Sequence, residues 1–131
     1  MRDLANQGIN LIKPLANRLR TPASIDAYVR SVFRYESEPV ETLCTVQFMV
    51  DSISKYGYFV GDCDDVSIFL ASLLKSLGYR VKFVAIATKR NDPNFYHVFT
   101  DVMISGQWFR FDPTVSSGTT HIYYKEMIVN V

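Results

Sequence analysis

Hydrophobic residues spaced three and four apart predict two helices at the start of the chain. The first covers about residues 5–19, where Pro14 is expected to start or bend a turn. The second is the stretch "TPASIDAYVRSVFRYESE", in which Thr21 before Pro22 is typical of a helix N-cap. Its apolar face consists of Ile25, Tyr28, Val29, Val32 and Phe33. Residues 41–60 fit either a strand or a short buried helix, and we favour the helix.

The strongest helical pattern begins at Asp62. An apolar stripe at positions i, i+3, i+4 and i+7 follows it, and Gly78 is a typical C-terminal stop. Asp62 is a good N-cap residue, and Asp65 three positions later can complete a capping box. The stripe consists of Val66, Phe69, Leu70, Leu73, Leu74 and Leu77.

Four later segments alternate or cluster β-branched and aromatic residues and are separated by turn residues, so they predict strands. They are "RVKFVAIAT", "FYHVFTDVMI", "QWFRFDPT" and "HIYYKEMIVNV". Helices followed by hairpin-linked strands indicate an α+β fold with an antiparallel sheet, rather than a βαβ repeat. We expect a single domain over residues 1–131, with N-terminal helices in residues 1–40 and the functional core in residues 41–131.

Composition excludes several classes of protein. Of the 131 residues, 48% are hydrophobic and 21% charged, which is typical of a soluble globular chain. The net charge of +1, without runs of either sign, gives no reason to expect binding to nucleic acid or to a membrane. The start of the sequence lacks the apolar core of a signal peptide, and we expect a cytoplasmic location.

Two cysteines, Cys44 and Cys63, could form one disulfide, but free thiols are favoured in a chain of this type. Cys44 is assigned to the core. Cys63 falls in the first turn of the helix that starts at Asp62, where the helix dipole favours a thiolate. Nearby carboxylates oppose that ionisation, so a cationic partner is needed. Taken alone, Cys63 fits an inert buried cysteine better than a reactive one.

A hairpin could supply the cation. A two-residue turn at Ser105-Gly106 sets Asp101 opposite Arg110, a favourable cross-strand pair. It also places His97 and Asp112 on one face of the sheet, about 7 to 8 Å apart at the backbone. A loop one residue longer would send them to opposite faces. The full predicted pairing is Ile104 with Gln107, Met103 with Trp108, Asp101 with Arg110, and Phe99 with Asp112.

Each of these residues has a simpler interpretation: His97 as a satisfied core histidine and Asp112 as a turn residue before Pro113. Together with Cys63, however, they form the parts of a Cys-His-Asp triad. The thiolate is the nucleophile, the imidazole is the base and acid, and the carboxylate orients the ring. We therefore favour the triad over the separate structural roles.

The segments "GDCDD", "SIFLASLLKSLGYRVKFVAIA", "YHVFTDV" and "GQWFRFDPT" together resemble the transglutaminase-like superfamily, over about residues 47–114. This resemblance implies a papain-like fold in which Cys63 is the nucleophile, His97 the base and Asp112 its orienting acid. It also suggests Gln47, with the Cys63 backbone, as an oxyanion-hole donor. The segment after Gln47 lacks the proline expected near such a glutamine.

The implied activity is acyl transfer on an amide of a peptide or protein through a thioester, as in a peptidase, amidase or transglutaminase-like enzyme. The alternative is a catalytically silent module that binds a partner, for instance in a bacteriophage assembly. Small stand-alone proteins of the resembling type occur in bacteria and phages. If the protein belongs to a phage assembly, the expected location is the virion. We interpret the loop "KRNDPNF" as a solvated loop and the segment "HIYYKEMIVNV" as an edge or core strand. The alternative is that these two segments form substrate walls or contact a partner.

No metal or other cofactor is expected. The aspartates around Cys63 do not match a calcium-loop pattern. A zinc site would need more ligands than Cys44 and His121, the residues left over. His121 is assigned to the surface or to packing.

Overall fold

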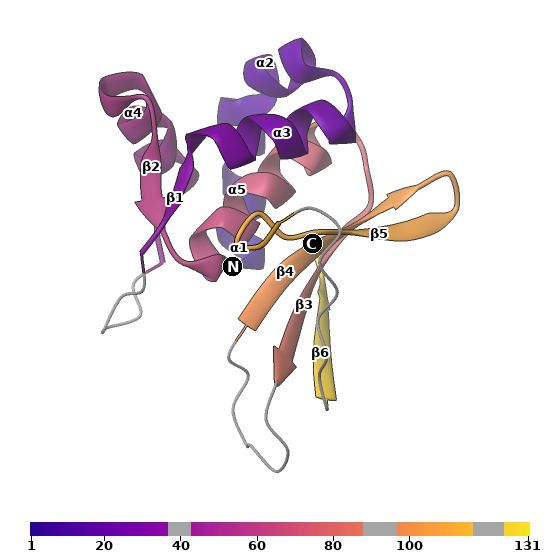
Figure 1. Ribbon diagram of the computed structural model, residues 1–131. Coiled ribbons are helices and arrows are strands. Elements are labelled where there is room, and N and C mark those ends of the chain that lie inside the picture. Colours follow the sequence, from indigo (N-terminus) through magenta and orange to yellow (C-terminus); the bar gives the residue numbers. More distant parts are fainter. Residues whose placement is uncertain (37–42, 88–96, 117–124) are drawn as a thin grey trace.

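The computed structural model describes residues 1–36, 43–87, 97–116 and 125–131 as five helices and six strands among those residues (Figure 1). The helices are α1 (Arg2–Gln7), α2 (Ile9–Leu19), α3 (Pro22–Val32), α4 (Val46–Tyr56) and α5 (Cys63–Ser76). The strands are β1 (Phe33–Tyr35), β2 (Phe59–Gly61), β3 (Val81–Ala87), β4 (His97–Ile104), β5 (Gln107–Phe111) and β6 (Lys125–Asn130). The predicted α+β class is confirmed.

Helix α5 is the centre of the fold. Helices α1, α2 and α3 pack on one side of it, and strands β3 and β4 pack on the other (Figure 1). All residues from Asp65 to Leu74 are buried, including the polar Ser67 and Ser72. The Ser72 hydroxyl donates to the carbonyls of Ala5 and Ile68, which satisfies its hydrogen bonding inside the core. The predicted apolar stripe is therefore only part of a helix that is buried on every side.

The N-terminal region departs from the expected two helices. The first predicted helix is interrupted at Gly8, which joins α1 to α2 and packs against α4: a Cβ built on Gly8 would clash with Cγ2 of Val46. Pro14 lies inside α2. Thr21 caps α3 as predicted, by accepting a hydrogen bond from the Ser24 N–H.

The assignment of Phe33 to a helical face was wrong. Helix α3 ends at Val32, and Phe33 begins β1, which pairs in parallel with β2. The Phe33 and Phe59 rings lie 5.4 Å apart between centroids, so strand pairing with an aromatic contact outweighs the helical spacing. Strand β2 was not predicted either, whereas the preference for a helix within residues 41–60 is confirmed by α4.

The four-stranded sheet, which is separate from the β1–β2 pair, has the strand order β5-β4-β3-β6, and all its pairs are antiparallel. The predicted hairpin register is confirmed from Ile104 opposite Gln107 to Asp101 opposite Arg110. Ser105 and Gly106 both have positive φ angles, 52° and 82°, as a two-residue hairpin turn of this kind requires. Residues 121–124, at the start of the last predicted strand, and the loop "KRNDPNF" lie outside the described residues.

Candidate active site

The start of α5 carries Cys63 on a fully formed capping box. Asp62 Oδ1 accepts hydrogen bonds from the N–H groups of Asp64 and Asp65, at 3.0 and 3.3 Å. Asp65 Oδ2 in return accepts from the Asp62 N–H at 3.1 Å. Burial raises the pKa of Asp62, and the neighbouring charge of Asp65 adds to that rise. The capping role predicted for these aspartates is confirmed.

Asp65 also ties the helix start to two neighbouring segments. Its carboxylate is fully buried, and Oδ1 accepts a hydrogen bond of 2.9 Å from the backbone N–H of Cys44, just before α4. Gly61 packs so closely that an added Cβ would meet Asp65 Oδ2 at 2.7 Å. One buried carboxylate therefore fixes the positions of β2, the segment before α4 and the first turn of α5.

The hairpin brings His97 and Asp112 together. His97 is the first residue of β4, and Asp112 directly follows the end of β5 at Phe111. His97 Nε2 lies 2.6 Å from Asp112 Oδ2, a short charge-assisted hydrogen bond. The Cys63 side chain is a second hydrogen-bond partner of the same ring. Because Asp112 engages Nε2, the ring nitrogen left for the thiol is Nδ1.

Asp112 is itself held on two sides. Its Oδ1 accepts from both the backbone N–H and the hydroxyl of Thr114, at 3.1 and 2.6 Å. Arg30 on α3 donates to the backbone carbonyls of Asp112 and Val115, and its Nε pairs with Asp26 at 3.0 Å. The carboxylate is buried, so these contacts fix which oxygen faces the imidazole.

The protonation of His97 follows from these contacts. Burial alone would lower the pKa of the imidazole, but hydrogen bonds to Asp112 and Cys63 and their charges outweigh burial and raise the pKa from 6.5 to about 9. The ring is therefore a cation at neutral pH. Its positive charge lies beside the Cys63 side chain, where the sequence predicts a cationic partner.

The other candidate residues lie elsewhere. The Gln47 amide is on the exposed side of α4 and donates to Asp51 Oδ1 at 2.8 Å, so its proposed role in an oxyanion hole gains no support from this arrangement. Cys44 and Cys63 are not joined by a disulfide. Cys44 is half-buried: it packs against the core and also faces a groove. His121 lies outside the described residues.

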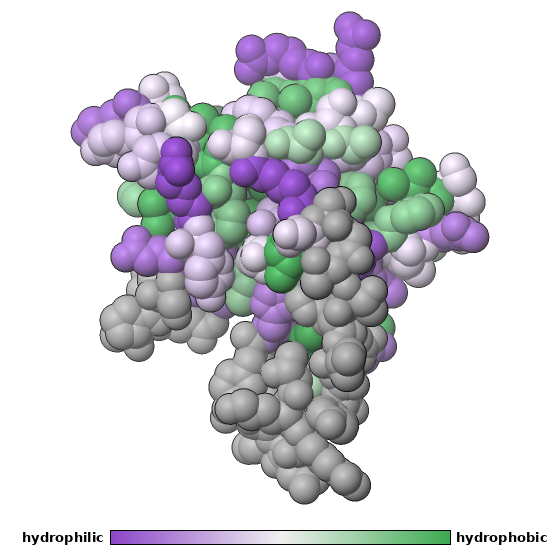
Figure 2. Space-filling model, viewed as in Figure 1, coloured by the Kyte–Doolittle hydropathy of each residue, from purple (hydrophilic) through white to green (hydrophobic). Residues whose placement is uncertain are grey.

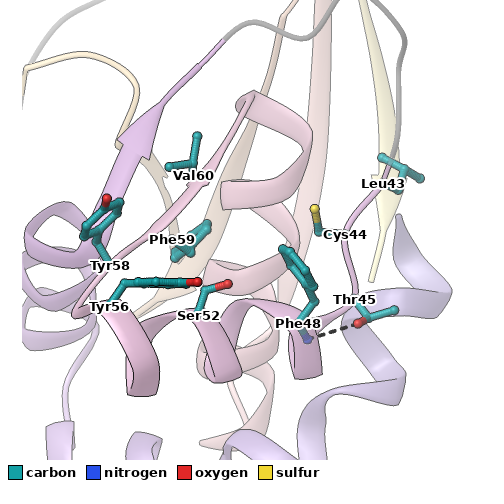
Figure 3. Close-up of a pocket in the computed structure, with 9 residues that line it drawn as sticks. All are labelled: Leu43, Cys44, Thr45, Phe48, Ser52, Tyr56, Tyr58, Phe59 and Val60. Carbon is teal, nitrogen blue, oxygen red and sulfur yellow. Dashed lines mark hydrogen bonds between the residues drawn. The ribbon is translucent and has the colours of Figure 1, made fainter.

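An apolar groove of about 740 Å³ lies between α4 and β2 (Figure 3). Phe48 and Ser52 extend from α4 towards Phe59 and Val60 of β2, with Cys44 at one end (Figure 3). Figure 2 shows green, apolar surface among hydrophilic residues at the left of the view, where α4 and β2 lie, and again at the β4–β5 hairpin on the right. The lining residues are Leu43, Cys44, Thr45, Phe48, Ser52, Tyr56, Tyr58, Phe59 and Val60.

Sequence reasoning missed Arg30 and Thr114. Thr114 lies two residues after Asp112, a spacing at which an aspartate commonly accepts hydrogen bonds from the chain that follows it, so the motif "DPT" carried a usable signal. Arg30 carried none, because it lies more than 80 residues before Asp112 and meets it only through the packing of α3. Within the described ranges, no three His, Cys, Asp or Glu side chains are grouped as metal ligands would be. Nor does any helix there have the length and hydrophobicity to cross a bilayer.

Comparisons with known proteins agree with this architecture. The family model of the transglutaminase-like superfamily matches residues 7–113. Among solved structures, a protein of Cytophaga hutchinsonii, itself only proposed to be a cysteine protease, superposes with a TM-score of 0.57 at 22% identity. The match covers 80% of this chain but 37% of that one, so the chain spans little more than a third of the length of its structural relative. The search of curated proteins gave no match. Because the family model covers most of the chain, from α1 to the residue after Asp112, the chain belongs to the transglutaminase-like superfamily.

Proposed function

We propose that this protein is a cysteine-dependent acyl-transfer enzyme that hydrolyses an amide bond of a peptide or protein. The observation that carries the proposal is the 2.6 Å contact between His97 Nε2 and Asp112 Oδ2 on a ring that also binds the Cys63 side chain. These contacts support the assignment of Cys63 as nucleophile, His97 as base and Asp112 as orienting acid, which is the order that thiol catalysis needs. The family and the fold of the structural relative support the same chemistry.

In the first step, the Cys63 thiolate attacks the amide carbonyl carbon, and the carbonyl electrons move to the oxygen. When this tetrahedral species collapses, the carbon–nitrogen bond breaks and the His97 imidazolium gives its proton to the leaving amine. A thioester remains on Cys63. His97, now neutral, takes a proton from water, which attacks the thioester and releases a carboxylic acid and the thiolate.

The helix start offers a donor for the oxyanion. The capping box uses the N–H groups of Asp64 and Asp65, and the Val66 N–H bonds to the Asp62 carbonyl. Among the hydrogen bonds of the described residues, the Cys63 N–H takes no part in this cap. Cys63 is the first residue of α5, where backbone N–H groups have no carbonyl partner within a helix and the helix N-terminus stabilises negative charge.

The test is intact-mass spectrometry with peptide mapping after treatment with iodoacetamide and with an electrophilic acyl probe. Cys44 is the matched control, since both cysteines are half-buried. We expect alkylation of Cys63 at least tenfold faster than that of Cys44, and loss of both the acyl adduct and peptide hydrolysis in Cys63→Ala. Equal labelling of the two thiols would contradict an activated nucleophile.

The same experiment separates hydrolysis from its alternatives. A primary amine added with the peptide would give an amide product if the protein were a transamidase. A catalytically silent module would give no acyl adduct and would instead co-purify with an assembly partner. Of these outcomes we favour hydrolysis, with water as the acceptor.

A further inference from the structure

The groove between α4 and β2 has no role in the chemistry described above. Its walls carry four large side chains that are exposed although apolar or aromatic: Leu43, Phe48, Tyr56 and Val60 are 40%, 58%, 61% and 38% exposed. A cluster of exposed apolar side chains around a hollow is typical of a binding surface. The volume, about 740 Å³, falls in the range of sites that hold small ligands or side chains.

The groove lies near the candidate nucleophile, Cys63. Val60 on its wall precedes Cys63 by three residues, so their Cα atoms are at most about 11 Å apart. Cys44 at its other end is held to the first turn of α5 by the hydrogen bond from its N–H to Asp65. An extended peptide advances about 3.3 Å per residue, so 11 Å corresponds to about three residues.

The lining favours an uncharged occupant. Among the described residues, no side chain that lines the groove is charged. The polar groups of this described lining are the hydroxyls of Thr45, Ser52 and the two tyrosines and the thiol of Cys44. Two cations stand beside those tyrosines: Lys55 Nζ lies 5.2 Å from the ring centroid of Tyr56, and the Arg34 guanidinium carbon 4.4 Å from that of Tyr58. Lysine or arginine in the occupant would therefore meet like charge.

We infer that this groove binds an aliphatic or aromatic side chain of the substrate, within about three residues of the bond that Cys63 attacks. The inference rests on the proposed function for the identity of the occupant as substrate. It makes Phe48 and Tyr56 specificity-determining residues, and the apolar side chain is bound by burial against their rings.

Binding can be measured without catalysis. The Cys63→Ala protein is titrated with N-acetyl-phenylalanine amide, N-acetyl-leucine amide, N-acetyl-alanine amide and N-acetyl-lysine amide, and amide chemical shifts are followed by NMR. We expect the phenylalanine and leucine compounds to bind at least about tenfold more tightly than the alanine and lysine ones. Shift changes should centre on Ser52 and Val60.

Phe48→Ala in the same background should remove this preference. Phe109→Ala is the matched control, because Phe109 is also an exposed phenylalanine, 43% exposed, but lies on β5. The inference is overturned by equal binding of the four amides, by shift changes centred on Trp108 and Phe109, or by equal effects of the two substitutions. Concentration-dependent self-association that Phe48→Ala abolishes would also overturn it, by showing that a second copy occupies the groove.

Cleavage specificity gives the second measurement. Active protein is incubated with a peptide mixture, and cleavage sites are mapped by mass spectrometry; an apolar residue should be enriched at one position within three residues of the cleaved bond. Phe48→Ala should lower kcat/KM for such peptides at least tenfold and for alanine-containing peptides by less than threefold. If no peptide is cleaved, the proposed hydrolysis fails while the NMR titration still decides the groove. Cleavage without any apolar preference overturns the groove alone.

Discussion

Two regions of the molecule are linked to the first turn of α5, and they differ in burial, charge and hydrogen bonding. In the first region, His97, Asp112, Thr114 and Arg30 are connected by hydrogen bonds around a buried carboxylate. In the second region, the described lining of the groove between α4 and β2 is largely apolar, carries no charged side chain and is exposed.

The contrast indicates a division of labour. Polar groups that must transfer a proton in a fixed direction need neighbours that lock their orientation, and such groups act only on atoms within hydrogen-bond reach. An apolar surface needs no fixed orientation, because burial is nearly non-directional, and it can bind parts of a substrate that do not react. We therefore expect substitutions around His97 and Asp112 to lower the reaction rate, and substitutions in the groove to lower the selectivity for substrates.

The largest effect is expected for Asp112→Asn. The amide can still accept from Thr114, but it carries no charge to hold the imidazolium, so kcat/KM should fall by about 10² to 10⁴-fold. The iodoacetamide rate at Cys63 should fall as well, because the pKa of the imidazole falls and a smaller fraction of the ring is protonated. Steady-state kinetics and alkylation rates check this, with unchanged circular dichroism as the control. Wild-type rates in this variant would show that Asp112 has no part in catalysis.

Arg30→Met should reduce kcat by about 10 to 100-fold with little change in KM, since Arg30 positions the Asp112 segment and does not touch the reacting atoms. The matched control is Asp26→Asn, which breaks the ion pair on α3 but leaves both carbonyl contacts of Arg30 in place. A purely structural role would lower the melting temperature equally in both variants and leave kcat intact. That outcome would show that Arg30 on α3 does not position the active site.

The pH dependence gives a smaller effect of known sign. The pKa of His97 is raised from 6.5 to about 9, so kcat/KM should fall as pH rises through about 9, because the neutral ring cannot protonate the leaving amine. The raised value also stabilises the fold: this stabilisation is complete below about pH 6.5 and is lost as pH rises through about 9.

Rate profiles and denaturant titrations at pH 6 and pH 10 test both statements. In Asp112→Asn the basic limb should move to lower pH, because a contact that raises the pKa is removed. A limb that stays near pH 9 in that variant would assign the titration to another group.

The smallest effect is expected for Tyr56→Ala with a probe too small to fill the groove. Alkylation of Cys63 by iodoacetamide should change by less than about twofold, and the free energy of unfolding by about 0.5 kcal/mol or less, because the Tyr56 side chain is 61% exposed. Cleavage of peptides with apolar side chains should nevertheless weaken. A large loss of alkylation would show that the two regions do not act separately.

Local sequence determined much of this protein. The capping box at Asp62, the thiol in the first turn and the turn at Ser105-Gly106 depend on residues two to three positions apart, so their physical causes are visible along the chain. Hairpin register then followed from a strict period of two, which is why His97 and Asp112 could be placed on one face before their contact was known.

Tertiary structure decided the rest. The conversion of Phe33 from helix to strand, the support of Asp112 by Arg30 and the link from Cys44 to Asp65 all join segments more than 20 residues apart. The groove likewise exists only where α4 packs beside β2. Such contacts depend on how whole elements pack, and packing is set by the shape of the entire core and not by any local pattern of residues.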